Sequence, residues 1–137
     1  MRNWRIGAAV VLIGAMAILA ARVSESASPE RRGRVLRHVV LYKFKDGLTP
    51  AQVQEIVDAF AALPKKIDAI VGYEHGTNVS QEGKSEGLTH AFVVTFRDEK
   101  GRDAYLKHPA HDHYVSVVRD RREQVVVFDY WADEQEL

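Results

Sequence analysis

The stretch VLRHVVLYKF (residues 35–44) carries β-branched, aromatic or aliphatic residues at nearly every position. Such a run is typical of a β-strand that is covered on both faces. The stretch QVVVFDYW (124–131) has the same character near the other end of the chain. Two further strands are indicated between them, IVGYEHGTNV (70–79) and THAFVVTF (89–96), and in the second His90 shares a face with the apolar residues. The sequence therefore predicts a sheet of four strands.

A helix is expected directly after the first strand, in the segment DGLTPAQVQEIVDAFAAL (46–63). Thr49 suits the N-cap, Pro50 the first helical position and Gln52 the third, which together form a capping box. Apolar residues then recur at helical spacing and form one stripe. Its members are Val53, Ile56, Val57, Phe60 and Leu63.

The second helical region lies between the third and fourth strands. Asp98 can cap a short helix that runs through Leu106, and Pro109 can begin another that runs to about Glu123. The order is β-α-β-β-α-β, an α+β fold of the ferredoxin-like kind. The helices would cover one face of the sheet and leave the other face apolar, which calls for a partner. A second copy is the simplest partner, so we expect a homodimer.

The N-terminal segment differs from the rest of the chain. It has a basic start, a run of uncharged apolar residues at 6–21, and then a polar, charged flank. This is the pattern of an export signal. We expect residues 1–27 to be a signal peptide of an exported (periplasmic or secreted) protein, or an uncleaved anchor that holds it to a membrane through residues 6–21. Residues 28–34 would be a linker, residues 35–132 the working domain and residues 133–137 an acidic tail.

The overall composition excludes several classes of function. Lysine and arginine number 19, as do aspartate and glutamate, so the formal net charge is zero. This balance gives no electrostatic reason to expect nucleic acid as a partner. The chain has no cysteine. Disulfides, thiol nucleophiles and thiolate metal sites are thereby excluded.

Three histidines stand close together in the stretch YLKHPAHDHYV (105–115). If a helix begins at Pro109, His111 and His113 lie about 200° apart around its axis and cannot share an ion. We therefore expect no metal there, and no cofactor. His111 falls on the same stripe as Tyr114 and faces the core, whereas His113 faces water. His111 could equally be a core histidine whose ring nitrogens are both satisfied.

Other polar residues occupy inward positions on the expected strands. They are His38 on the first strand, His90 on the third and Asp129 on the fourth. Tyr105 closes the helix before the turn at His108 and Pro109. A neutral imidazole can take a proton while a phenol donates a hydrogen bond to a carbonyl that is becoming an enolate. Together these positions favour a polar-lined pocket.

The strings RHVVLYKFKDGLT, GLTHAFVVTF, YLKHPAHDHY and VFDYW, in this order, resemble the stress-responsive dimeric α/β-barrel family, often shortened to Dabb. The resemblance covers about residues 37–131. It implies a ferredoxin-like protomer and a homodimer in which the two sheets form a barrel.

The same resemblance implies roles for individual residues. In a cyclase of the family, which closes a linear polyketide thioester to an aromatic acid without a cofactor, the catalytic tyrosine and histidine fall on Tyr105 and His111 of this sequence. His38, His90 and Asp129 match polar positions of its cavity and strands. Two bulky aromatic residues of that cavity fall here on Val57 and Phe60, and a tryptophan falls on Arg122, which implies a pocket of another shape. We expect the substrate-binding residues to be His38, His90, Asp129, Phe60, Val57 and Tyr114.

Three hypotheses for function remain open from the sequence. The first is an exported homodimeric module that binds a small apolar or aromatic ligand in stress defence. The second is a cofactor-free cyclase or lyase that performs an intramolecular aldol condensation, with His111 as the base and Tyr105 as its partner. The third is a cofactor-free monooxygenase or a haem-degrading enzyme, two classes that related dimeric barrels include.

Overall fold

The computed structural model describes residues 33–133, which form one four-stranded antiparallel sheet. The strands are β1 (Arg34–Phe44), β2 (Gly72–Thr77), β3 (His90–Phe96) and β4 (Arg122–Asp133). They lie in the order β2-β3-β1-β4, so β1 is central and pairs with both β3 and β4.

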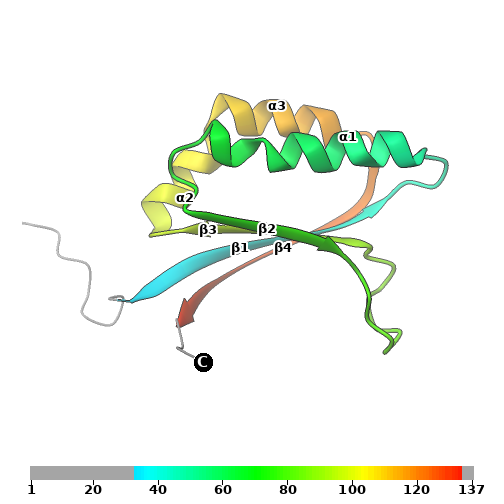
Figure 1. Ribbon diagram of the computed structural model, residues 1–137, viewed down its shortest axis with the longest axis horizontal. Coiled ribbons are helices and arrows are strands. Elements are labelled where there is room, and N and C mark those ends of the chain that lie inside the picture. Colours follow the sequence, from blue (N-terminus) through cyan, green and yellow to red (C-terminus); the bar gives the residue numbers. More distant parts are fainter. Residues whose placement is uncertain (1–32, 134–137) are drawn as a thin grey trace, which may run out of the picture.

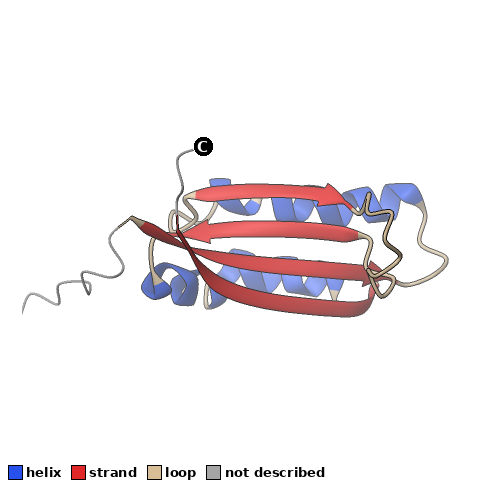
Figure 2. Cartoon of the chain, turned by 90° about the horizontal axis from the view of Figure 1, so that it is seen from below, coloured by secondary structure: helices blue, strands red, loops and turns tan. Residues whose placement is uncertain are grey.

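The helices all lie on one face of this sheet (Figure 1). They are α1 (Pro50–Ala61), the short 3-10 helix η2 (Leu63–Lys65), α2 (Glu99–Leu106) and α3 (Pro109–Val118). Seen from the opposite side, the strands stand in front of the helices, and no helix of the described residues covers this face (Figure 2). This is the ferredoxin-like α+β fold that the sequence predicts.

Helix α1 begins where its capping residues require. The Thr49 side chain accepts a hydrogen bond from the Gln52 backbone N–H at 3.2 Å, and the Gln52 side chain accepts one from the Thr49 backbone N–H at 2.9 Å. The two bonds satisfy N–H groups that the first helical turn leaves without partners. The predicted capping box is confirmed.

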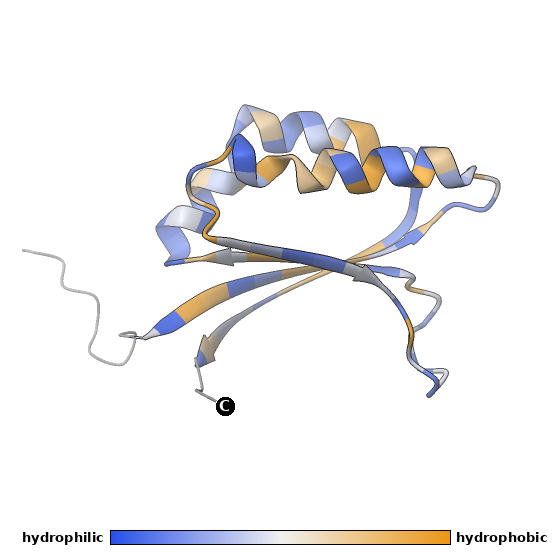
Figure 3. Ribbon diagram, viewed as in Figure 1, coloured by the Kyte–Doolittle hydropathy of each residue, from blue (hydrophilic) through white to orange (hydrophobic). Residues whose placement is uncertain are grey.

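The hydrophobic core fills the space between the helices and the sheet. Helices α1 and α3 carry hydrophobic residues in repeated bands between hydrophilic ones (Figure 3), and their inward sides meet alternate residues of β1 and β3. The buried residues on these two strands are Leu36, His38, Val40, Tyr42, Phe44, Phe92, Val94, Thr95 and Phe96.

The uncovered face of the sheet carries the other residues of each strand. Val39 lies at the centre of this face, opposite Val93 on β3 and Phe128 on β4. Phe128 is 63% exposed, and its neighbours Val126 and Tyr130 on the same face are also exposed. The predicted apolar face without a cover is therefore present.

Several boundaries differ from the sequence-based expectation. Helix α3 ends at Val118 rather than near Glu123, and β4 begins at Arg122. The Arg121 carbonyl accepts a hydrogen bond from the Lys45 N–H at 2.9 Å, and Arg122 then pairs with Phe44. Because Arg121 and Arg122 bond to the end of β1 and the residue after it, they do not continue the helix. The pairing of β1 with β4 also extends the two strands to Arg34 and Asp133, which were expected to belong to the linker and the acidic tail.

The export signal or anchor, most of the linker and most of the acidic tail fall on residues 1–32 and 134–137, which lie outside the described residues. Within the described part of the chain, none of the helices has the length and apolar character that a membrane crossing requires.

Candidate functional site

A histidine–aspartate pair, in which the histidine is buried and the aspartate is partly exposed, joins the two long strands of the sheet. His38 on β1 and Asp129 on β4 are register partners, and the His38 Nδ1 lies 2.7 Å from the Asp129 Oδ1. A carboxylate accepts hydrogen bonds, so the imidazole donates through Nδ1. Arg102 on α2 donates to the second oxygen of Asp129 at 3.1 Å. Both carboxylate oxygens are thus held, and His38 is fixed in one orientation.

Tyr105 links this pair to helix α3. Its ring centroid lies 5.6 Å from that of His38, and 4.5 Å from that of His111 on α3. Phe96 on β3 contacts both Tyr105 and His38 and closes one side of the group. Tyr105 is 1% exposed and His38 5%, whereas His111 is half-buried. The structure therefore brings His38, Asp129, Tyr105 and His111 together.

The three histidines at the start of α3 have three different surroundings. His108 is the N-cap, and its Nδ1 accepts a hydrogen bond from the Ala110 N–H at 3.0 Å. His111 faces Tyr105, and His113 is exposed. Among residues 33–133, no group of three or more side chains of the metal-binding types could hold a metal ion.

Burial sets the protonation states of the two central residues. Desolvation lowers the pKa of His111 below its ordinary value of 6.5, and nearby His38 lowers it further, while Asp112 acts in the opposite direction. Desolvation also raises the pKa of Tyr105 well above its ordinary value of 10. At neutral pH His111 is therefore a neutral base, and Tyr105 is a protonated hydrogen-bond donor.

An aromatic cluster adjoins these residues in the core. The ring of Phe60 on α1 lies 4.6 Å from that of Tyr114 on α3, and 4.5 Å from that of Phe92 on β3. Tyr73 on β2 stacks on Phe60 from another direction at 5.7 Å. Val57 is also buried on α1. Three further predicted site residues, Val57, Phe60 and Tyr114, therefore lie in the same core as Tyr105.

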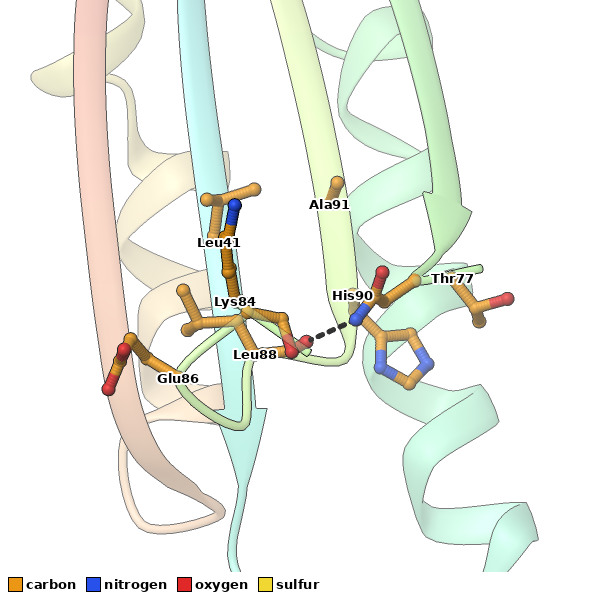
Figure 4. Close-up of a pocket in the computed structure, with 9 residues that line it drawn as sticks. Leu41, Thr77, Lys84, Glu86, Leu88, His90 and Ala91 are labelled. Atoms are coloured by element: carbon orange, nitrogen blue, oxygen red, sulfur yellow. Dashed lines mark hydrogen bonds between the residues drawn. The ribbon is translucent and has the colours of Figure 1, made fainter. Parts of the chain in front are cut away.

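His90 does not belong to this group. It pairs with Tyr42, four residues along β1 from His38, which is a separation of about 13 Å at the usual rise of a strand. Its ring contacts Phe44 at 4.9 Å. His90 instead borders a hollow of about 290 Å³ between the β2–β3 loop and the uncovered face of the sheet (Figure 4). Leu41 and Ala91 line this hollow from the sheet, and Leu88 lines it from the loop.

Sequence reasoning missed two kinds of residue in this region. Arg102 holds Asp129 across 27 positions of sequence, a contact that no local pattern indicates. Tyr42 and Tyr73 also reach the core, and the alternation of their strands was the only available signal. The inward direction of His111, in contrast, followed from the period of the helix.

Comparison with known proteins gives a consistent assignment. The model of the family described as "Stress responsive A/B Barrel Domain" matches residues 36–132, which is more than half of the chain. A stress-response A/B barrel domain-containing protein of Arabidopsis thaliana, HS1, is 34% identical over 101 residues, covering 74% of this chain and 92% of that protein. Olivetolic acid cyclase of Cannabis sativa is 36% identical over 95 residues, covering 69% of this chain and 94% of the cyclase.

A solved structure agrees with these matches. A dimeric ferredoxin-like protein of unknown function from Thermobifida fusca superposes with a TM-score of 0.62 at 25% identity, and the match covers 72% of this chain and 92% of that one. The fold, the family model and the related sequences point to the same group of proteins. This chain belongs to the stress responsive A/B barrel domain (Dabb) family.

Proposed function

We propose that this protein is a homodimer that binds a small apolar or aromatic molecule beside Tyr105 and the half-buried His111. The observation that carries the proposal is the contact between these two residues, with ring centroids 4.5 Å apart, at the end of a fixed His38–Asp129 pair. The family is described as stress responsive, so we assign the binding to stress defence.

The buried polar atoms support a ligand at this place. The Nδ1 of His111 is buried and makes no hydrogen bond of normal length and angle with a described residue, while the backbone of Leu106 interacts with the ring and acts to raise its pKa. A buried polar group without a partner lowers stability, and such groups are rare in native cores except where they serve a function. An arrangement that leaves a neutral imidazole nitrogen unpaired beside a phenol favours a bound molecule with a donor or acceptor of its own.

The uncovered face of the sheet supports the homodimer. It presents Phe128, Val126 and Tyr130 to solvent, and the hollow beside Leu41 opens on the same face. Apolar patches of this kind mark interaction sites in soluble proteins. The similar Thermobifida fusca protein is a dimer with the same fold. A second copy packed on this face would close the two sheets into a barrel.

A second candidate function is proton transfer without a cofactor, as in a lyase or cyclase. The lowered pKa of His111 and the raised pKa of Tyr105 favour it, because they supply a neutral base beside a protonated donor. Olivetolic acid cyclase, at 36% identity, is named for a cyclisation. In this chain His111 would remove a proton from a carbon next to a carbonyl, and Tyr105 would stabilise the oxygen that gains negative charge.

Hydrogen exchange in a simple aromatic ketone tests both candidates. Acetophenone in D2O exchanges its methyl protons when a base removes them, and proton NMR follows the loss of signal. Proton transfer predicts faster exchange with the wild-type protein, loss of the acceleration in His111→Ala, and no change in His113→Ala, the matched exposed histidine. Line broadening of acetophenone without faster exchange would leave only the binding function, and absence of both effects would contradict the proposal.

We also propose that residues 1–27 direct export, on the strength of the basic start and the apolar run at 6–21. Expression of the full chain in a bacterium with an export system, followed by intact-mass analysis, tests this. Loss of the mass of about the first 27 residues is expected for a cleaved signal, and full mass in the membrane fraction for an anchor. Full-length protein in the cytoplasmic fraction would contradict export.

A further inference from the structure

The uncovered face of the sheet is bulky along one edge and hollow along the other. The edge strand β4 presents Val126, Phe128 and Tyr130 on this face, and all three are exposed. The opposite edge strand, β2, presents Glu74 and Gly76, because these two residues pair with the β3 residues of the same face. A hollow of about 240 Å³ lies there. It is lined by Glu74, His75, Gly76, Ala91 and Val93. The bulky edge of one copy can therefore enter the hollow of another.

Nothing within a single copy requires glycine at position 76. The φ angle of Gly76 is not positive, and β2 pairs with β3 in an unbroken register around it. A Cβ atom added there would meet no heavy atom within 4 Å beyond its neighbours in the chain. Glycine weakens the interior of a strand and often marks a place where a group from elsewhere approaches the backbone closely. The space beside Gly76 is therefore suited to a group from outside the protomer.

Two charged side chains of opposite sign stand on the same face, and neither forms an ion pair with a described residue. Arg37 on β1 is partly buried and donates to the neutral hydroxyl of Thr95. Glu74 on β2 is exposed. Lys43, the other charged residue that β1 presents on this face, is already paired with Glu123 at 2.7 Å. Covering a face that carries unpaired charges is costly, so a partner on this face must supply the opposite charges.

One packing of two copies matches the bulky edge with the hollow. A twofold axis parallel to the strands, between two facing sheets, keeps the rows of residues level and reverses the order of the strands. The order β2-β3-β1-β4 then places β4 of one copy over β2 of the other. Through the register of the sheet, Val126 shares a row with Gly76, and Phe128 shares a row with Glu74. Val126 therefore lies over the partner's Gly76, and Phe128 lies beside the partner's Glu74.

The same packing brings the two charges together. Arg37 is the register partner of Tyr130, so it lies diagonally from Phe128 on the neighbouring strand. Diagonal neighbours on adjacent strands are about 7–8 Å apart, within the reach of long side chains. Because Phe128 lies beside the partner's Glu74, the guanidinium of Arg37 can reach that carboxylate. Twofold symmetry repeats the contact, so both arginines and both glutamates gain a partner.

We propose that, in the homodimer, Val126 of each copy packs over the partner's Gly76 and Arg37 of each copy forms an ion pair with the partner's Glu74. The inference rests on the proposed function, from which it takes the homodimer, and it adds the register in which the two sheets meet. It gives a role to a strand glycine and to two charges that have none in a single copy. The ion pair also makes the contact selective, because a shift of one sheet along the other would separate the charges.

Reversal of the two charges, singly and together, tests the ion pair. The dissociation constant of the dimer is measured by sedimentation of the full chain at low salt. The variants are Arg37→Glu, Glu74→Arg and the combination of both. The control combines Glu74→Arg with Lys43→Glu, which reverses another charge on the strand and face that carry Arg37.

Each single reversal is expected to raise the dissociation constant at least about tenfold, because it places like charges together at two sites. The combined reversal should return to within about threefold of the wild type, and the control combination should stay weak. A single reversal that leaves the dimer as tight as the wild type, or a combined variant as weak as the single ones, would overturn this inference.

Gly76→Val tests the packing without a change of charge. Valine suits a strand and has space within its own chain, so circular dichroism should show a folded protein. The dissociation constant should nevertheless rise at least about tenfold, because the new side chain takes the place of the partner's Val126. Thr77→Val, on the other face of β2, should leave it unchanged. A Gly76→Val dimer as tight as the wild type would overturn this inference and leave the homodimer intact. A wild-type protein with the mass of one chain would overturn the homodimer as well.

Discussion

At the scale of single residues, the central feature is Asp129. It sits on the edge strand β4, accepts from His38 at 2.7 Å and from Arg102 at 3.1 Å, and so ties together β1, β4 and α2. A carboxylate held on both oxygens fixes the imidazole that it contacts. Through His38, it also determines the surface against which Tyr105 packs.

Replacement of this carboxylate tests its contribution to stability. Asp129→Asn keeps the shape of the side chain but removes the negative charge of the carboxylate, which accepts hydrogen bonds from both His38 and Arg102. Because the pair is largely buried, we expect the free energy of unfolding to fall by about 1–3 kcal/mol in urea titrations. Asp133→Asn removes an exposed carboxylate from the same strand and should cost less than about 0.5 kcal/mol. Equal effects of the two changes would contradict a special role for Asp129.

The buried histidines predict how stability depends on pH. Desolvation lowers the pKa of both His111 and His90 in the folded protein. Between the ordinary histidine pKa of about 6.5 and these lowered values, the unfolded chain binds more protons than the folded one. The free energy of unfolding should therefore fall as the pH drops below about 6.5, and be largest above it.

Denaturant titrations at pH 7.5 and 5.5 measure this dependence. His111→Asn removes one of the responsible groups, so its loss of stability on acidification should be smaller than that of the wild type. His113→Asn, at an exposed position of the same helix, should behave like the wild type. A variant at position 111 that loses as much stability as the wild type would contradict the effect of burial on this histidine.

At the scale of elements, α3 determines where His111 lies. The helix starts at Pro109, and the preceding His108 caps it through a hydrogen bond from the Ala110 N–H. The residue at which the helix starts determines which side chains face the sheet. As a result, His111 faces Tyr105, and Tyr114 points into the core. One local bond thus orients a residue of the candidate site.

Loss of this cap should weaken the helix. His108→Ala is expected to lower the free energy of unfolding by about 1 kcal/mol, because the first turn loses an acceptor. His108→Asn provides an acceptor of the preferred kind and should preserve stability. Chemical denaturation followed by circular dichroism measures both. An alanine variant as stable as the asparagine variant would show that this hydrogen bond makes no net contribution to the free energy of unfolding.

The elements also explain which features the sequence could predict. The start of α1 was predictable because Thr49, Pro50 and Gln52 act within one turn of chain. The end of α3 was not, because the pairing of Arg122 with Phe44 on a distant strand sets it. The same distinction holds for the site. The direction of His111 follows from the helix period, whereas the separation of His90 from His38 depends on the register of β1 and β3.

At the scale of the whole molecule, the sheet has one covered face and one uncovered face (Figures 1 and 2). Consecutive residues of β4 lie on opposite faces of the sheet. Phe128 lies opposite Val39 on the uncovered face and is 63% exposed, while Val127 lies opposite Val40 on the side of the helices and is 55% exposed. The two positions have similar exposure, so their replacement separates the effect of the uncovered face from a general effect on the strand.

The mass in solution, measured by light scattering after size exclusion at micromolar concentration, tests the homodimeric barrel most directly. The wild-type protein should have twice the mass of one chain. Phe128→Asp should have the mass of a single chain, because it places a charge in the interface, and Val127→Asp should remain a dimer. A wild-type protein with the mass of one chain, or a Phe128→Asp variant that is as dimeric as the wild type, would contradict the account.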